Sequence, residues 1–345
     1  MTDLPSVTVI IPVYNGAAHI RRALDSVVRQ TVPPLEVIVI DDGSTDDSAS
    51  AISEAAAAAP RVDVRVMSQP NAGQSHARNR AAREARGDLL AFLDQDDLWH
   101  PAHIAVLAEA FVDAPGLGFC YGDFDEIDGD GHVVARRYIR AHGVEHPRST
   151  VVEWIESDTM VIPTATVVRR SAYLEVGGFD PELIGYEDDD LWIRLFRAGW
   201  DGRFVEESVA MFRVHAESSS RRSTFRESRV RFFRKTAEAL PDDPGLARYY
   251  ASDILLPRMV RSALGEYLAA LRRGADDEAR QVASTIDELF RGRRSRILRR
   301  RERWALHHPA LVRRGLRIRR MFRTSPGERL SPARRLREGY YEWTD

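Results

Sequence analysis

Three aspartates stand where a buried apolar run of the sequence ends. Residues 89–93 predict a buried strand, and Asp94, Gln95, Asp96 and Asp97 follow it directly. Carboxylates this close repel one another unless a cation or a donor-rich ligand lies among them. Short acids at a strand end of an open α/β sheet suit Mg²⁺ or Mn²⁺, itself held by a diphosphate. Taken alone, the segment equally suits a polar loop or the acidic first turn of a helix.

A second acid run, Glu187-Asp188-Asp189-Asp190, opens an amphipathic helix predicted over 191–198. Acids complement the dipole at a helix N-terminus, but four in succession exceed what capping requires. Where two carboxylate clusters face one cavity, one can hold a metal while the other acts as general base. A base that takes a proton from an acceptor hydroxyl suits a single in-line displacement at a sugar carbon.

One histidine and one turn complete the candidate ligands. His215 follows a strand predicted over 209–214, and a neutral imidazole can complete a Mn²⁺ shell, although a lone histidine is more often structural or at the surface. Residues 128–131 superficially resemble a calcium loop, but the acid spacing fails and no glutamate closes it. This segment predicts a hairpin turn before His132.

The elements that must position these residues alternate between strand and helix. Pro12 is expected to end the first strand because proline cannot donate to a ladder. Strands alternating with helices predict an α/β fold with a doubly wound, mostly parallel sheet flanked by helices. The predicted strands are 7–11, 35–40, 62–66, 89–93, 116–121, 165–169 and 209–214; the predicted helices are 16–30, 51–59 and 74–86, and residues 177–180 form a tight turn.

Three polar clusters are expected to meet at one edge of this sheet. Tyr14 and Asn15 follow the first strand, Asp41 the second and Asp94 the fourth. The ends of parallel strands share one edge, so these residues should converge on one crevice. There Asp41 can accept from a base or ribose, Tyr14 can stack on a base, and Arg78 can meet a base carbonyl or phosphate. Read singly, Asp41 equally suits a capping turn and Arg78 an exposed helix position.

The glycine-rich nucleotide motifs are missing. Neither G-x-G-x-x-G nor G-x-x-x-x-G-K-[ST] occurs, so dinucleotide-binding and P-loop interpretations lose support. A nucleotide held through a metal at a D-x-D motif remains.

Composition limits the class of protein. The 345 residues contain 43% hydrophobic residues and a single cysteine, Cys120, which excludes an internal disulfide and cysteine zinc sites. No apolar run approaches the roughly 18 residues that a spanning helix needs. The N-terminal residues lack the basic and apolar regions of a secretory signal. We therefore expect a cytoplasmic protein, with the inner face of the plasma membrane as a site of peripheral association.

The charge is divided unevenly along the chain. Residues 1–220 carry 19 basic and 36 acidic side chains, whereas residues 221–345 carry 31 and 16. Residues 291–345 hold 18 arginines among apolar residues such as Trp304. We expect a catalytic domain over 1–224 and a helical, Arg-rich region over 225–345. Basic amphipathic helices there suit an anionic membrane surface; packing on the acidic domain or on a second subunit, as in a homo-oligomer, is an equal alternative. Nucleic-acid binding is disfavoured because no recognition motif accompanies the charge.

The motifs, taken in order, resemble those of family 2 glycosyltransferases with a GT-A fold, over about residues 5–220. The segments that carry the resemblance are Val7-Thr-Val-Ile-Ile-Pro-Val-Tyr-Asn15, Val37-Ile-Val-Ile-Asp-Asp-Gly-Ser-Thr-Asp46, Asn71-Ala-Gly, Ala77-Arg-Asn79, Leu93-Asp-Gln-Asp-Asp97, Gly177-Gly-Phe-Asp180 and Glu187-Asp-Asp-Asp-Leu-Trp192. The resemblance implies inverting transfer of a sugar from a nucleotide-diphospho-sugar, with a UDP-sugar favoured and Mg²⁺ or Mn²⁺ as cofactor. A glycan or lipid-linked acceptor in cell-envelope or surface polysaccharide synthesis would fit.

The resemblance also implies roles for individual residues. Asp188 matches the general base and Glu187 would orient the acceptor, while Asp189 departs from the family because an aromatic residue is common there. That departure leaves the choice between Asp188 and its neighbours open. The expected donor-site residues are Pro12, Tyr14, Asn15, Asp41, Arg78 and Asp94, and the expected metal ligands are Asp96 and His215.

Two other functions remain as alternatives. A sugar-phosphate nucleotidyltransferase would usually carry a glycine-rich loop with Arg and Lys after its first strand, which is missing here. A non-catalytic nucleotide- or carbohydrate-binding scaffold would not require the acids present in both runs.

Overall fold

Seven consecutive buried residues form β1 (Val7–Val13), the strand at the centre of the parallel half of the sheet in this computed structural model. The structure describes residues 4–214, 224–291 and 298–313. The strand does not end at Pro12 as expected: Pro12 pairs with Ile40 and Val13 with Asp41 of the neighbouring strand. A proline removes one donor only, and the flanking residues continue the ladder.

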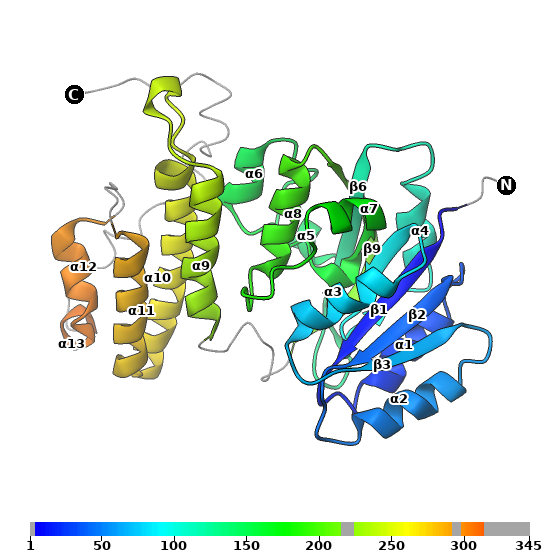
Figure 1. Ribbon diagram of the computed structural model, residues 1–345. Helices are drawn as coiled ribbons and strands as arrows, with labels where there is room; N and C mark the ends of the chain where they lie inside the picture. The colour runs from blue at the N-terminus through cyan, green and yellow to red at the C-terminus, as the bar shows by residue number, and fades with distance from the viewer. Residues whose placement is uncertain (1–3, 215–223, 292–297, 314–345) are drawn as a thin grey trace. The chain divides into compact units, whose positions relative to one another are not determined.

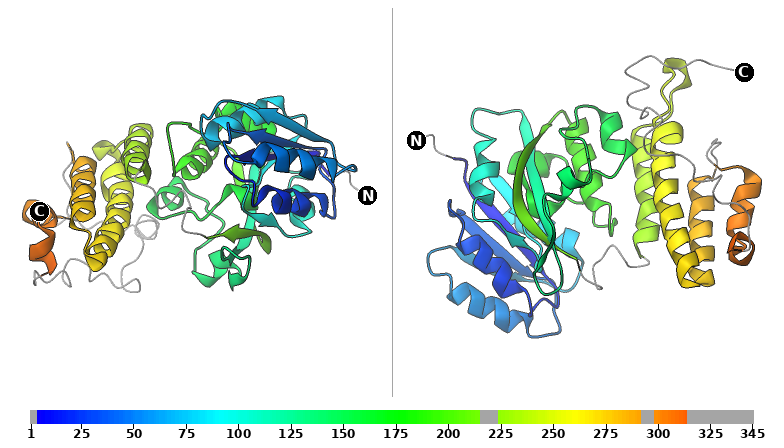
Figure 2. Two further views of the ribbon diagram at one scale, coloured as in Figure 1. Left: turned by 90° about the horizontal axis from the view of Figure 1, so that it is seen from below. Right: turned by 180° about the vertical axis from the view of Figure 1, so that it is seen from behind.

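The parallel half of the sheet has the strand order β3-β2-β1-β4. Right-handed crossovers place α1 and α2 on one face of these strands and α3 on the other, as Figures 1 and 2 show. This arrangement confirms the doubly wound α/β prediction. The other elements of this half are β2 (Glu36–Asp41), β3 (Val64–Ser68), β4 (Leu89–Phe92), α1 (Ile20–Val28), α2 (Ser48–Ala57) and α3 (Gln74–Glu84).

Helical spacing explains how α1 covers the sheet. Its buried residues Ile20, Ala23, Leu24 and Val27 recur every three or four positions and belong to the same core cluster as Val9 of β1. Burying each large aliphatic side chain contributes about 1.5–3 kcal/mol before the entropy of ordering it is subtracted. This packing holds the C-terminal ends of the parallel strands in a fixed arrangement.

The rest of the sheet is mixed. Antiparallel β8 lies between β4 and β6, β9 pairs parallel with β6, and β5 and β7 lie at the margins. The two longest strands, β6 and β9, are longer than the strands predicted at these positions. The elements are β5 (Leu98–Trp99), β6 (Leu117–Ile127), β7 (Val133–Ala135), β8 (Thr166–Arg169), β9 (Asp201–Arg213), α4 (His103–Glu109), α5 (Tyr138–Ala141), α7 (Arg170–Glu175) and α8 (Glu187–Arg197).

The chain divides into two units. Unit 1, which contains the sheet, comprises Met1–Ser149, Thr159–Glu182 and Glu187–Arg221; unit 2 comprises Thr150–Asp158, Leu183–Tyr186 and Arg222–Asp345. All the described candidate residues belong to unit 1.

Unit 2 is helical. Its α10 (Leu256–Arg273) and α11 (Asp276–Leu289) form a hairpin that turns at Gly274, whose φ of 74° suits glycine. Figure 1 shows α9 (Thr224–Ala239) beside this hairpin. No described helix is both long and apolar enough to cross a bilayer. The remaining helices are α6 (Val151–Glu156), α12 (Arg300–Leu306) and α13 (Pro309–Arg313), with a single 3₁₀ turn at Pro244–Leu246 and a short π-helix at Tyr250–Leu255.

Candidate active site at the edge of the parallel strands

The loops that follow β1 and β2 are joined by hydrogen bonds. The Asn15 N–H donates to Ser44 Oγ (3.0 Å), and Asn15 Oδ1 accepts from the Thr45 N–H (2.8 Å). The Gly16 N–H donates to Ser48 Oγ (2.8 Å). Since β1 and β2 are parallel, both loops lie at the edge where such sheets bind ligands. Asn15, expected to contact a nucleotide, uses its side-chain oxygen to hold this loop.

Gln95, the middle residue of the D-x-D motif, holds the loop that carries Tyr14. Its Oε1 accepts from the Tyr14 N–H (2.9 Å) and its Nε2 donates to the Tyr14 carbonyl (3.2 Å). A Cβ on Gly16 would lie 2.3 Å from Gln95 Oε1, so the glycine makes room for this contact. Tyr14 remains 45% exposed, which leaves its ring open for stacking. Sequence reasoning treated Gln95 as a spacer and missed this role.

The fourth residue of the loop, Asp97, is structural. Its buried carboxylate accepts from Thr164 Oγ1 (2.6 Å) and from the Arg213 N–H (2.7 Å). Burial, and then the charges of Asp96 and Asp94, raise the pKa of Asp97 well above its usual range. Asp94 and Asp96 are only half-buried. The two outer carboxylates of the motif are therefore the ones accessible to a ligand.

Arg78 is a fully buried cation on α3. It forms an ion pair with Asp94 and lies 5.1 Å from the centre of the Phe179 ring. Burial disfavours its charge, but the carboxylates of Asp94 and Glu187 outweigh that effect and raise the pKa of Arg78. Its Nε and Nη1 are buried with no hydrogen-bond partner in the structure. These two donor nitrogens are therefore available to an acceptor that enters the site.

The second acid run reaches the same helix. Gln74, one turn before Arg78 on α3, donates from Nε2 to Glu187 Oε1 (2.5 Å). Residues four apart share a helix face, so one face of α3 contacts Asp94 of the first run and Glu187 of the second. The two acid runs, more than 90 positions apart in the sequence, therefore meet around this helix.

Asp188 differs from the other acids of its run. Glu187, Asp189 and Asp190 are buried, whereas Asp188 is half-buried. Asp189 accepts from Thr159 Oγ1 (2.6 Å), and Asp190 accepts from Arg194 Nε (2.7 Å). The acid run forms the first turn of α8, where it complements the helix dipole.

The turn before α8 is tied to α3 by Asn79. Asn79 Nδ2 donates to the Phe179 carbonyl (2.7 Å), and Asn79 Oδ1 accepts from Tyr173 Oη (2.5 Å) and the Phe179 N–H (2.9 Å). From α8, Arg194 Nη2 donates to the Gly178 carbonyl (2.6 Å). Asn79 was visible in the sequence beside Arg78, but its role depends on contacts 100 positions away.

The two aspartates after β2 have separate roles. Asp42 is buried and accepts from the N–H groups of Ala72 (2.9 Å) and Gly73 (2.7 Å), which shapes the turn leading into α3. Asp41 is half-buried, and its Oδ1 accepts from the Ser44 N–H (3.0 Å). Asp41 is thus the more accessible acid. The sequence analysis did not identify the structural role of Asp42. Pro12 is buried within β1.

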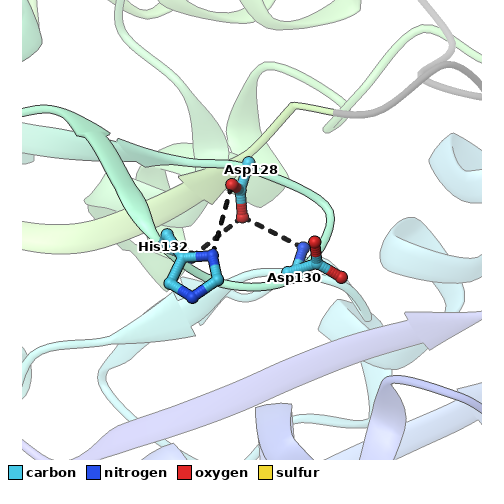
Figure 3. Close-up of side chains that lie close together, drawn as sticks. All are labelled: Asp128, Asp130 and His132. Carbon is cyan, nitrogen blue, oxygen red and sulfur yellow. Dashed lines mark hydrogen bonds and ion pairs between the residues drawn. The ribbon is translucent and has the colours of Figure 1, made fainter.

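The predicted hairpin turn forms as expected, and Figure 3 shows its side chains. Asp128 Oδ1 accepts from the N–H groups of Asp130 (3.0 Å) and His132 (2.9 Å). Ligand atoms of Asp128, Asp130 and His132 lie within 4.8 Å of one another. The Asp128 carboxylate is already used in the turn, and the cluster is largely exposed, as acidic groups often are without an ion.

The carboxylates of the D-x-D motif fit a hard divalent cation. Asp94 and Asp96 offer oxygen ligands at the strand edge, and the unsatisfied donors of Arg78 lie beside Asp94. His215, the other expected ligand, lies outside the described residues.

Comparison with known proteins agrees with this arrangement. Residues 8–177 match the model of glycosyl transferase family 2. These residues belong to this family.

The matches between this chain and its curated relatives cover different shares of each relative. An uncharacterized protein of Mycobacterium tuberculosis is 28% identical over 270 residues, which are 75% of this chain and 80% of that protein. The chondroitin synthase of Escherichia coli is 36% identical over 196 residues, or 57% of this chain and 27% of the synthase. A hyaluronan synthase of Pasteurella multocida is 30% identical over 57% of this chain and only 19% of its own length. The chain thus spans less than a third of either synthase.

Solved structures resemble this chain over more of its residues than the family model matches. TarS (residues 1–349) of Staphylococcus aureus, in complex with UDP-GlcNAc, has a TM-score of 0.59 at 19% identity, covering 89% of this chain and 87% of that chain. The mannosyltransferase PcManGT of Pyrobaculum calidifontis, in complex with GDP-Man and Mn²⁺, has a TM-score of 0.54 at 22% identity, covering 90% and 87%. These likenesses confirm the GT-A fold.

Proposed function

We propose that this family 2 protein is an inverting glycosyltransferase that moves a sugar from a nucleotide-diphospho-sugar to an acceptor hydroxyl. The observation that carries the proposal is Arg78: a buried cation with two unsatisfied donors, between an acid of the D-x-D motif and an acid of the second run. A donor's oxygen atoms would satisfy those N–H groups. Its position also explains why α3 contacts both acid runs.

On the donor side, the loops after three strands share the nucleotide. Tyr14 stacks on the base, Asp41 accepts from the base or ribose, and Arg78 donates to the donor. Asp94 contacts the ribose or the sugar. Asp96, with His215, would hold Mg²⁺ or Mn²⁺, which when bound offsets the charge of the leaving diphosphate. Asn15 supports this pocket by joining the loops after β1 and β2, and Pro12 is buried in the strand that leads into the first loop.

On the acceptor side, Asp188 acts as general base. It takes the proton of the acceptor hydroxyl as the oxygen attacks the anomeric carbon, and the bond from that carbon to the diphosphate oxygen breaks. The configuration inverts because attack and departure occur on opposite faces in one step. Support for Asp188 over its neighbours comes from its exposure, since Asp189 is buried against Thr159 and Asp190 against Arg194. Glu187, bonded to Gln74, orients the acceptor.

A donor survey tests this function. We would incubate the protein and Mn²⁺ with UDP-, GDP- and dTDP-sugars and follow nucleoside diphosphate release by chromatography. UDP-sugars come first because TarS is seen with UDP-GlcNAc, and GDP-sugars are included because PcManGT is seen with GDP-Man. Release from one nucleotide class, abolished by chelation, is the expected result. Binding without release would instead support the non-catalytic scaffold, and pyrophosphorolysis of the donor would support a nucleotidyltransferase.

The acceptor is proposed to be a glycan or a lipid-linked sugar in surface polysaccharide or cell-envelope synthesis. The support is the likeness to polysaccharide synthases and to TarS. We further propose that residues 1–224 carry the catalysis and that the Arg-rich region 225–345 associates with the cytoplasmic, anionic face of the membrane.

Exposed apolar and basic residues of unit 2 support the membrane proposal. Trp304 and Leu311 are 58% and 43% exposed, and Arg300 and Arg301 are exposed on the same short helix as Trp304. A tryptophan beside cations suits a lipid interface. Trp304→Ala should reduce co-sedimentation with phosphatidylglycerol vesicles, whereas Leu246→Ala, which truncates another exposed residue, should not. Equal sedimentation of both variants, or a concentration-dependent dimer that masks Trp304, would instead favour packing between subunits.

A further inference from the structure

Arg213, the last residue of β9, makes an unusual set of contacts for a buried cation. Its side chain is 3% exposed. The guanidinium Nε donates to the Asp96 carbonyl (2.7 Å), and Nη1 donates to the carbonyls of Asp128 (2.8 Å) and Gly129 (3.0 Å). All three acceptors are main-chain oxygens. Arg213 therefore joins the backbone of the D-x-D loop to the turn between β6 and β7.

A second bond fixes the same loop from the main chain. The Arg213 N–H donates to Asp97 Oδ1 (2.7 Å), while Asp97 Oδ2 accepts from Thr164 Oγ1 (2.6 Å). Arg213 thus holds both the Asp96 carbonyl and the side chain of the next residue, Asp97. The main chain that carries the half-buried Asp96 carboxylate is therefore fixed on its C-terminal side.

The turn that receives Arg213 is itself well formed. The Gly131 N–H donates to the Asp128 carbonyl (3.1 Å), and the Asp128 carboxylate caps the N–H groups of Asp130 and His132. The Val214 N–H donates to the Ile127 carbonyl (2.9 Å), so β9 reaches the start of the turn in register. A rigid turn provides a firm base for the guanidinium.

The geometry of arginine matters here. Its planar fork can donate to carbonyls from two segments at once, whereas a lysine ammonium on a flexible stem is a point donor. Groups that orient a metal ligand typically change metal affinity 10–100-fold when they are removed.

We propose that Arg213 is a positioning residue of the active site: it ties the Asp96 main chain to the β6–β7 turn and so presets the Asp96 carboxylate for the metal–diphosphate. The proposal rests on the proposed function, in which Asp96 holds the metal. It assigns to the β6–β7 turn the role of a support for the D-x-D loop.

The test compares Arg213→Lys with Arg169→Lys. Arg169 is a suitable control because its guanidinium likewise donates to main-chain carbonyls, those of Leu117 (2.9 Å) and Ala114 (2.9 Å), in another part of unit 1. We would measure UDP binding by calorimetry with Mn²⁺ and with EDTA, and follow thermal unfolding. Arg213→Lys should raise the Mn²⁺-dependent Kd about tenfold, with the Kd in EDTA unchanged, and Arg169→Lys should change neither. Equal Mn²⁺-dependent binding by both variants would overturn the proposal.

A second pair of variants covers the case in which Arg213→Lys does not fold. Asp128→Ala removes the cap of the turn, whereas Asp128→Asn keeps an acceptor oxygen. Asp128→Ala should weaken Mn²⁺-dependent UDP binding about threefold, a fraction of the loss of a direct support, and Asp128→Asn should not. No difference between them would count against a role for the turn.

Asp96→Asn separates this inference from the proposed function. If it abolishes the Mn²⁺ dependence of UDP binding while Arg213→Lys leaves that dependence intact, the metal site stands and the role of Arg213 is refuted. If Asp96→Asn keeps the Mn²⁺ dependence, the proposed metal site itself is wrong, and the inference is overturned with it.

Discussion

The two acid runs of unit 1 are built in opposite ways. In the D-x-D loop, neighbouring residues are bonded to different parts of the fold: Asp94 to α3, Gln95 to the loop after β1, and Asp97 to Thr164 and β9. The run at the start of α8 is a regular helical turn in which three buried acids have their own partners.

This difference suits different tasks. A site that holds a metal and a diphosphate needs several oxygens in a fixed arrangement, which a loop anchored at many points can supply. A general base needs one accessible carboxylate whose neighbours do not move. Asp188, half-buried among buried acids, meets that description. Arg78 belongs to both regions, because its charge is stabilised by Asp94 and by Glu187.

Removal of the metal ligand should have the largest effect. We expect Asp96→Asn, or chelation of the wild type, to lower turnover about 1,000-fold, because the leaving diphosphate loses its counter-charge. Transfer assays with added Mn²⁺ would measure it. Asp130→Asn, in the exposed hairpin cluster, is the control and should retain activity. Loss of Mn²⁺ dependence in Asp130→Asn would instead assign the metal site to the hairpin.

Replacement of Arg78, the cation that both acid runs stabilise, should have the second-largest effect. Arg78→Gln leaves Asp94 and Glu187 without the charge between them, and donor affinity should fall about 100-fold, in line with about 3 kcal/mol for a buried charge pair. Calorimetry with UDP and Mn²⁺ would measure it. Arg80→Gln, on the same helix, loses contacts to Ser68 and Gln69, away from both acid runs, and should bind normally. Equal donor affinity of Arg78→Gln and Arg80→Gln would mean that Arg78 does not link the two acid runs.

A change at Gln74 should affect the acceptor side alone. Gln74→Ala frees the Glu187 carboxylate from its bond to α3, so the acceptor KM should rise about tenfold, as for the loss of one charge-assisted hydrogen bond. The donor Kd should stay constant. His76→Ala provides a matched truncation of an exposed residue on α3. A rise in donor Kd without a change in acceptor KM would assign Glu187 to the donor.

The smallest effect is expected at Thr159, and it should be on stability. Thr159→Val leaves the buried Asp189 carboxylate without its hydroxyl donor, and the free energy of unfolding should fall by about 1–3 kcal/mol. Urea unfolding would measure this, with Thr166→Val as a control that removes one neutral bond to the Ile162 carbonyl. Turnover should change little. A loss of turnover as large as that expected for Asp96→Asn would give Asp189 a catalytic part.

The sequence predicted the parallel half of the fold well, because β1, β2 and β4 are buried, mostly aliphatic runs. It underestimated β6 and β9, where Asp123, Glu206 and Glu207 break the apolar pattern. Asp123 is nevertheless buried, since its carboxylate accepts from the N–H groups of Phe124 and Ile139 (both 2.8 Å). A local sequence pattern does not show that a buried acid is stabilised by hydrogen bonds from residues farther along the chain.

The candidate site was predictable in its residue types but not in its supports. Strand ends and acid runs are visible along the sequence, so Asp41, Asp94 and Asp188 were all candidates. The contact of Gln95 with Tyr14, and that of Asn79 with Phe179, join segments about 80 and 100 positions apart. These contacts have no periodicity and no motif of their own, and only the fold brings them together.

The division of labour between the two acid runs can be tested directly with Asp188→Asn. Calorimetric titration with UDP and Mn²⁺, alongside transfer assays on the same preparation, would report donor binding and turnover together. We predict a donor Kd within about twofold of wild type and turnover at least about 1,000-fold lower, the effect of removing a general base. Asp189→Asn should keep most of its turnover. Near-wild-type turnover of Asp188→Asn, or loss of its donor binding, would contradict the account.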